Sequence, residues 1–217
     1  MIDLSLSTFK PSMQIDDPLL MKDMIIARLE ELIPSSEIKV SMDEIKYALD
    51  FAYERHKGQT RREGAPYVMH PYRVLLRLLE EGLHTQDTMI IAILHDVVED
   101  TNTAPEEVST VFGTIVGDGV LALSRQIYTE DKKIPDEDYF NGLYRSVDYV
   151  KRIKVYDRID NTFSQLSIPV KSKEEMKHIV SRYVSDTNAI YAQLTDIDHR
   201  LEEKLQEASA YILSYNE

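Results

Sequence analysis

The chain has 217 residues, a length that suits one folded domain with a sizeable core. Its formal net charge of −13 argues against duplex nucleic acid and anionic membranes as partners, so a phosphate ligand would need a local metal or basic pocket. The absence of cysteine excludes disulfides and thiolate metal sites, and with no signal-like start or long apolar run it leads us to expect a soluble, cytoplasmic protein.

The spacing of apolar residues predicts an all-α fold, since no alternating strand pattern persists. Residues 1–16 are expected to form an irregular lead-in. A helix then begins at Asp17-Pro18 and ends at Pro34. Its predicted apolar stripe consists of Leu20, Met24, Ile25, Leu29 and Leu32.

A capping box at 41–44 predicts a second helix, which runs to about Lys57 and stops at Gly58. The inner face of this helix consists of Ile45, Ala48, Leu49, Ala52 and His56. A histidine on such a face is either a metal ligand or a buried imidazole bonded to a backbone carbonyl. The residues alone leave both interpretations of His56 open.

The segment 58–71 contains two glycines and two prolines and is expected to be a loop. Arg61 and Arg62 lie in the most basic stretch of this acidic chain, either as solvated charges or as a clamp for phosphate. His70 stands at the start of a helix predicted over 71–82. It is either a simple helix cap or a rigidly placed metal ligand.

A strongly apolar run leads into His95-Asp96 and Glu99-Asp100, in a helix predicted over 86–99. On a continuous helix that turns about 100° per residue, these four ionisable side chains share one face. Acidic groups near a helix C-terminus oppose the helix dipole, and a divalent cation would compensate them. The alternative is a helix end with solvated acids.

The next segments are expected to be structural. A second capping box at 103–106 predicts a short helix that ends at Gly113, and residues 115–123 continue the core. Residues 128–138 are polar and are expected to form an exposed loop without chemistry.

A longer helical pattern starts at Tyr139 and reaches Asn161, with Val147 among its apolar positions. Asp157 and Asn161 are one turn apart on one face of this predicted helix. Taken alone the pair indicates little, because an acid beside an arginine on a helix is usually a solvated ion pair.

Residues 172–216 are expected to form one amphipathic helix or a helical pair. The apolar positions that recur every three or four residues are Ile190, Leu194, Ile197, Leu201, Leu205, Ala208 and Ile212. This stripe either packs back on the domain or forms the seam of a homodimer. Asp196, Asp198 and His199 are expected on the solvated face.

Three separated segments carry a resemblance to a known family. The segments consist of Gly58-Gln59, Arg61, Gly64, Pro66-Tyr67 and His70-Pro71; then 95–101; then Lys154, Asp157-Arg158 and Asn161. A histidine, a His-Asp doublet and a later aspartate in this order resemble the HD superfamily of metal-dependent phosphohydrolases, and more narrowly the RelA/SpoT-type alarmone hydrolases. The resemblance covers about residues 42–168.

The resemblance implies an HD-domain helical bundle over 41–170, with an N-terminal lead-in and helix over 1–40 packed on it and a C-terminal helical extension over 171–217. It implies one divalent metal, usually manganese, with four ligands: His70, His95, Asp96 and Asp157. The implied acid–base pair is Glu99 and Asp100. The implied substrate-binding residues are Arg61, Arg62, Lys154 and Asn161. His56 would then be structural.

The implied reaction removes pyrophosphate from the 3′ position of guanosine tetra- or pentaphosphate, giving GDP or GTP. At this length we expect a stand-alone hydrolase without the synthetase and regulatory domains of the family. The chain departs from the family pattern at Ala65, Tyr156, Asp160 and Thr162, and the last two are expected near the nucleotide pocket. An alternative is another pyrophosphorylated nucleotide or RNA end as substrate, or service as an antitoxin to a toxic alarmone synthetase.

Overall fold

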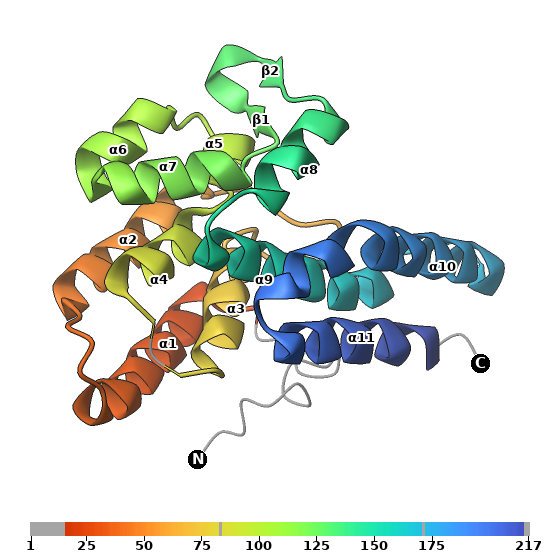
Figure 1. The fold of residues 1–217 in the computed structure, drawn as a ribbon, viewed down its shortest axis with the longest axis horizontal. Helices are drawn as coiled ribbons and strands as arrows, with labels where there is room; N and C mark the ends of the chain where they lie inside the picture. Colours follow the sequence, from red (N-terminus) through yellow and green to blue (C-terminus); the bar gives the residue numbers. More distant parts are fainter. Residues whose placement is uncertain (1–15, 83, 171, 215–217) are drawn as a thin grey trace.

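The computed structural model of the chain describes residues 16–82, 84–170 and 172–214, so the lead-in predicted for 1–16 lies almost wholly outside it. Over these ranges the protein is a bundle of helices with one very short hairpin, which confirms the all-α prediction (Figure 1). Within them, no helix is both long and apolar enough to cross a membrane. The α-helices are α1 (Pro18–Leu32), α2 (Met42–Arg55), α3 (Met69–Leu79), α4 (Gln86–Leu94), α5 (Val97–Asp100), α6 (Pro105–Phe112), α7 (Thr114–Leu123), α8 (Asp136–Tyr144), α9 (Asp148–Ser164), α10 (Lys173–Ile190) and α11 (His199–Ser214). The 3₁₀ turns are η2 (Ile33–Ser35), η3 (Tyr128–Glu130), η4 (Gln165–Ser167) and η5 (Tyr191–Ile197), and the strands are β1 (Gln126–Ile127) and β2 (Lys132–Lys133).

Helices α3, α4 and α9 form the centre of the bundle and contact one another. In Figure 1, α1, α2, α6 and α7 lie on one side of this centre, and α10 and α11 lie on the other. Helix α4 is buried at every position from Thr88 to Leu94, because it is apolar all round. The chain that follows α4 therefore delivers His95 directly into the interior.

The first two helices begin where the sequence predicts. The Asp17 carboxylate accepts the N–H groups of Leu19 and Leu20 at the start of α1, and Ser41 caps α2 in the same way. The predicted inner face of α2 is buried throughout. The predicted stripe of α1 was wrong at its start: Met21 is buried, whereas Leu20 is exposed.

The continuous helix predicted over 86–99 was wrong, because it breaks between α4 and α5 at His95 and Asp96. The His95 imidazole bonds the carbonyl of Ala92 at 2.9 Å, and this is the carbonyl to which a continuing helix would direct the Asp96 N–H. The turn separates the His-Asp doublet from the short helix that carries Glu99 and Asp100.

The single helix predicted from Tyr139 to Asn161 was also wrong, because it is divided into α8 and α9. Helix α8 ends in a tighter turn, in which the Arg145 and Ser146 N–H groups donate three residues back, to the carbonyls of Gly142 and Leu143. Val147 is extended and 54% exposed, so it does not belong to the core stripe.

The segment 128–138, predicted to be a loop, contains some regular secondary structure. Strands β1 and β2 pair in antiparallel fashion, and Asp136 to Asp138 already belong to α8.

The capping box predicted at 103–106 was wrong, since the α6 cap is Ala104 and makes no side-chain hydrogen bond. Thr103 is buried and pairs with the hydroxyl of Thr101 at 2.7 Å instead.

The C-terminal residues form the helical pair α10 and α11, joined by η5. Leu194, Leu201, Leu205 and Ala208 are buried in the same hydrophobic core as the centre of the bundle. Ile212 belongs to a smaller cluster with Val180 and Val184 of α10. These stripe positions therefore pack within the chain, which is the first of the two predicted alternatives.

Candidate metal centre and adjoining cleft

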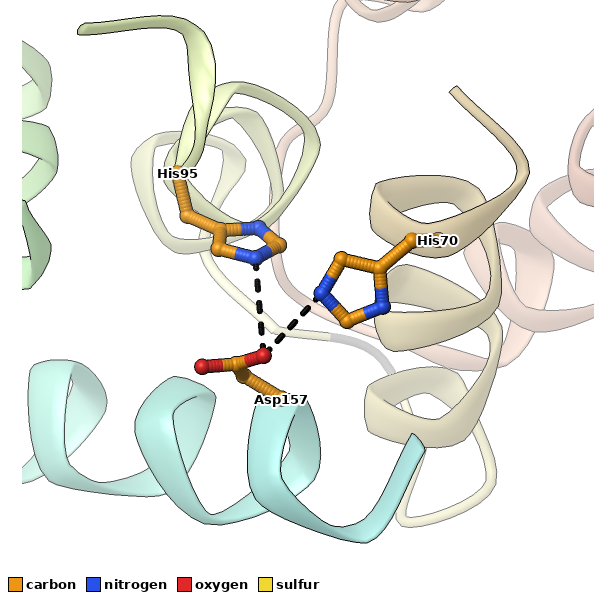
Figure 2. Close-up of side chains that lie close together, drawn as sticks. All are labelled: His70, His95 and Asp157. Carbon is orange, nitrogen blue, oxygen red and sulfur yellow. Dashed lines mark hydrogen bonds and ion pairs between the residues drawn. The ribbon is translucent and has the colours of Figure 1, made fainter. Parts of the chain in front are cut away.

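Three segments far apart in the sequence meet at one point, as Figure 2 shows. His70 lies in the first turn of α3, His95 in the turn after α4, and Asp157 in the middle of α9. Asp157 Oδ1 is 3.0 Å from His70 Nε2 and 4.0 Å from His95 Nε2. One ligand atom from each residue lies within 4.8 Å of the other two, and all three residues are buried.

Asp96 lies beside this trio. Its Oδ1 is 3.2 Å from His95 Nε2, and its Oδ2 is 3.5 Å from His70 Nε2. The single proton of the Tyr67 hydroxyl lies between Asp96 Oδ2, 3.1 Å away, and Asp100 Oδ2, 2.5 Å away, so the stronger hydrogen bond goes to Asp100. The structure thus brings together the four residues expected as ligands, with three in mutual reach and Asp96 adjacent.

The donor atoms of this group fit a divalent cation. Because a carbonyl only accepts, the bond from His95 Nδ1 to the Ala92 carbonyl places a proton on Nδ1, so the neutral form of the ring carries its lone pair on Nε2. This Nε2 is buried and has no hydrogen-bond donor or acceptor paired with it among the described residues. The oxygens nearest to this nitrogen belong to the carboxylates of Asp96 and Asp157, which are hydrogen-bond acceptors as well. A cation would remove the repulsion between these lone pairs, and imidazole with carboxylate is a common donor set for divalent metals.

Asp157 is fixed by two further residues of α9. Lys154 Nζ is 2.8 Å from Oδ2, and the Asn161 amide donates to Oδ1 at 2.5 Å. Burial acts to raise the pKa of Asp157, but the charge of Lys154 and the hydrogen bond of His70 hold it well below its usual range. Asp157 is therefore a charged carboxylate inside the protein, which needs positive partners.

Two more carboxyl groups lie beside the trio, on α5. Burial raises the pKa of Glu99 to about 7, despite the nearby charge of Lys154, and its Oε2 accepts the Arg125 N–H at 2.8 Å. Asp100 accepts the Tyr67 hydroxyl at 2.5 Å. Burial and the charge of Asp96 raise the pKa of Asp100. A carboxyl group that titrates near neutral pH is suited to moving protons.

A cleft of about 330 Å³ lies between the 58–71 loop, α9 and α10. None of the trio lines this cleft, but Asn161, which does, donates a hydrogen bond to Asp157. Arg61, Arg62 and Asn161 line the cleft, together with Tyr183 of α10. Arg61 donates to Asn161 Oδ1 at 2.5 Å and to Glu63 at 3.0 Å, whereas Arg62 is exposed. The 58–71 loop therefore supplies positive charge close to the trio of His70, His95 and Asp157. Lys154 does not line this cleft and lies instead against Asp157 and the Tyr139 ring.

Asp160 and Thr162, expected near the nucleotide pocket, flank the cleft-lining Asn161 in sequence but do not line the cleft themselves. Asp160 contacts His70 and Arg73 in the interior, and the Thr162 hydroxyl donates to the carbonyl of Arg158. The Tyr156 hydroxyl bonds Glu81 on the far side of α9. None of these side chains lines the described cleft.

His56 is buried, but its hydrogen bond goes to the Gln59 side chain at 2.8 Å and not to a backbone carbonyl. Its ring stacks on Tyr67, with 4.7 Å between ring centres. Gln59 in turn donates to the Asp100 carbonyl at 2.7 Å. His56 thus lies outside the ligand trio and supports residues around it.

Near the C-terminus, the side chains of Asp196 and His199 are exposed, as expected for a solvated face. Asp198 differs from that expectation, because its side chain is only 12% exposed and pairs with Arg152 and Arg200.

Sequence reasoning assigned no role to several residues that surround the site. Tyr67 was noted only as part of a motif, and Glu63 and Tyr183 were not considered. Asp160 lies three residues after Asp157, so the spacing of the two acids on one helix face was a usable signal. Its contacts with α3 could not be foreseen, because they join residues 83 positions or more apart.

Comparisons with known proteins agree with this geometry. A family model described as an HD domain matches residues 48–202. The guanosine-3′,5′-bis(diphosphate) 3′-pyrophosphohydrolase of Aquifex aeolicus is 34% identical over 178 residues, which are 80% of this chain and 23% of that protein. The bifunctional (p)ppGpp synthase/hydrolase SpoT of Escherichia coli is 30% identical over 138 residues, 61% of this chain and 19% of that protein. The chain thus spans less than a quarter of the length of these relatives.

A solved structure shares the fold. It is described as a metazoan ortholog of SpoT that hydrolyzes ppGpp, and it superposes with a TM-score of 0.66 at 24% sequence identity. The match covers 79% of this chain and 96% of that one. The fold of this chain is therefore one already observed in a solved protein.

Proposed function

Because the chain belongs to the HD-domain family, we propose that it is a metal-dependent hydrolase that removes the 3′-pyrophosphate from guanosine tetra- or pentaphosphate. The observation that carries this proposal is the meeting of His70, His95 and Asp157 beside two carboxyl groups and a cleft with basic residues. The names of relatives from Aquifex aeolicus and Escherichia coli support this substrate.

We assign the metal to four residues: His70, His95, Asp96 and Asp157. When bound, a divalent cation supplies a Lewis acid and offsets the charge of the phosphates. Manganese suits the carboxylate oxygens of this set and is the metal we propose. The buried lone pair of His95 Nε2 supports the assignment, because it has no other use in the described part of the chain.

We assign proton transfer to Glu99 and its neighbour Asp100. Hydrolysis adds water across the bond between the ribose 3′-oxygen and the pyrophosphate, so one group takes a proton from the water and the leaving 3′-oxygen gains one. A carboxyl group with a pKa of about 7, such as Glu99, can take the proton from the water, because at neutral pH it is neither permanently ionised nor permanently neutral. Tyr67 holds the Asp100 carboxylate by a hydrogen bond and orients it.

We assign substrate binding to the residues that face the cleft or adjoin it. Arg61 and Arg62 supply guanidinium groups to the phosphates, and Asn161 lies between Arg61 and the metal group. Lys154 lies on the opposite side of Asp157 and adds positive charge there. In an acidic protein, this local charge is what makes a polyanionic substrate tolerable.

The test is release of pyrophosphate from guanosine tetraphosphate by the purified chain with manganese, with excess chelator, and with manganese restored. We expect activity to disappear with chelator and to return with the metal. Asp96→Ala should lose metal binding, whereas Glu99→Ala should bind metal and lose turnover. Unchanged turnover by metal-stripped Asp96→Ala would overturn the proposal.

A panel of other nucleotides and a pyrophosphorylated RNA end, assayed with manganese, tests the alternative substrate. If the chain prefers one of these substrates, the proposed metal site is retained but the alarmone is no longer the proposed substrate. Suppression of a toxic alarmone synthetase by a variant without turnover would point to an antitoxin that acts by contact. A homodimer through the C-terminal helices stays a prediction, which light scattering of the purified chain tests.

A further inference from the structure

One buried carboxylate next to the metal group has no part in the proposed mechanism. Asp160 is 1% exposed and lies on α9, three residues after Asp157. Its Oδ2 is 2.8 Å from His70 Nδ1. An ionised carboxylate in the interior is costly unless it is paired, so its position calls for a reason.

His70 lies between two carboxylates of the same helix. Asp157 Oδ1 is 3.0 Å from Nε2, and Asp160 Oδ2 is 2.8 Å from Nδ1. An imidazole can offer Nε2 to a metal only when the ring proton is on Nδ1. A carboxylate on the Nδ1 side accepts that proton in a hydrogen bond and fixes both the tautomer and the ring plane.

Asp160 is itself held in place by α3. Arg73 donates to it from Nε and Nη2 at 2.9 Å each, and Arg77 Nε is 3.4 Å from Oδ1. The forked contact with Arg73 leaves the carboxylate little freedom to rotate. The carboxylate therefore meets His70 in one orientation.

We propose that Asp160 is a positioning residue for the metal centre, which holds His70 with its proton on Nδ1 and its Nε2 lone pair toward the cation. The inference rests on the metal site of the proposed function but not on the substrate, so it stands if the substrate is a different nucleotide. The competing explanation is that Asp160 only neutralises Arg73 and Arg77 in the core.

The test compares Asp160→Asn with Arg73→Gln in the full chain. Both substitutions remove the ion pair between Asp160 and Arg73, but only the first alters the group that faces His70. The readouts are the Kd for Mn²⁺, from electron paramagnetic resonance of the free ion, and the Tm of the metal-free proteins. We expect Asp160→Asn to weaken Mn²⁺ binding by roughly 10- to 100-fold.

Arg73→Gln is expected to lower Tm and to weaken Mn²⁺ binding clearly less than Asp160→Asn does, because the Asp160 carboxylate still faces His70 but is held less firmly. Equal Kd values for Asp160→Asn and the parent would overturn the proposal. Equal weakening by both substitutions would do so as well, because the effect would then come from loss of local structure.

A second measurement is made on the parent chain itself, and a variant serves only to assign its signals. Nitrogen-15 NMR of the parent chain with the diamagnetic ion Zn²⁺ reports which nitrogen of each imidazole carries a proton, and the spectrum of His70→Gln assigns the His70 signals. We expect His70 to be protonated on Nδ1, with a proton shifted downfield by the Asp160 hydrogen bond. A His70 ring without a proton on Nδ1 would overturn the proposal.

Discussion

Asn161 donates its side-chain amide to Oδ1 of Asp157 at 2.5 Å, one turn earlier on α9. The same oxygen is 3.0 Å from His70 Nε2, and the Asn161 oxygen accepts from Arg61 at 2.5 Å. A residue expected to bind substrate is thus also a direct support of an expected metal ligand. The cleft and the metal group share this one side chain.

Substitution of Asn161 by alanine should therefore affect metal and substrate together. It removes the donor to Asp157 Oδ1 and the acceptor for Arg61, and loss of such a support typically costs about 10- to 100-fold in metal affinity. We expect a higher Kd for Mn²⁺ and a higher KM, measured by metal titration and by steady-state assay at saturating metal. A raised KM with an unchanged Kd would show that the contact with Asp157 has no role in metal binding.

Arg61 and Arg62 are adjacent in sequence but differ in their surroundings, which gives a matched pair of substitutions. Arg61 uses its fork to reach Glu63 and Asn161, and a lysine cannot make both bonds. Arg62 is exposed and acts as a charge that lysine keeps. We expect Arg61→Lys to raise KM by about tenfold, the effect of one lost charged hydrogen bond, and Arg62→Lys to leave it nearly unchanged.

Steady-state assays of the two lysine variants, at one fixed salt concentration, check this difference. Equal KM values for the two variants would show that only the charge of the loop matters.

The raised pKa of Glu99 predicts a pH dependence of stability in the metal-free chain. The folded protein keeps the Glu99 proton up to a pKa of about 7, whereas the unfolded chain loses it near the ordinary value of 4.5. The stabilising contribution is thus fully present below pH 4.5 and is lost as pH rises through 7. It amounts to at most about 3–4 kcal/mol, from about 2.5 pKa units at 1.36 kcal/mol each.

Urea unfolding of the parent and of Glu99→Gln at several pH values tests this prediction. Because the glutamine side chain of this variant cannot titrate, the difference in unfolding free energy between the two proteins isolates Glu99 from Asp100, whose pKa is also raised. We expect the variant to lose less stability than the parent between pH 4.5 and 7. Parallel pH profiles for the two proteins would contradict the raised pKa.

Local patterns in the sequence were sufficient for the helices whose ends are set by a single cap or by apolar spacing. Asp17 and Ser41 begin helices as predicted, because each cap involves only the next few residues. The break at His95 was missed because its side chain takes a carbonyl that the helix would otherwise use. Apolar periodicity carries no information about such a bond.

The candidate site was predictable only in part, for a related reason. The trio of His70, His95 and Asp157 could be proposed from a resemblance, and the structure brings these residues within reach of one another. The contact between Asp160 and His70 depends on how α3 lies against α9, which is decided by the packing of the whole bundle. The sequence therefore showed Asp160 only as a departure from a pattern.

The packing of α11 on the bundle leads to a prediction about the division of the chain at residue 170. Leu205 is 2% exposed and belongs to the central core, whereas Leu213 on the same helix is 41% exposed. Leu205→Ala should lower the unfolding free energy by about 2–5 kcal/mol, and Leu213→Ala should change it by less than about 0.5 kcal/mol. The central core would then depend on the C-terminal helices.

Thermal unfolding at several protein concentrations measures both variants. If α11 supports only its own chain, the loss of stability in Leu205→Ala is the same at every concentration. If the stripe instead forms a seam between two copies, Tm rises with protein concentration in the parent and Leu205→Ala weakens that dependence. The burial of Leu201, Leu205 and Ala208 within one chain supports the first outcome.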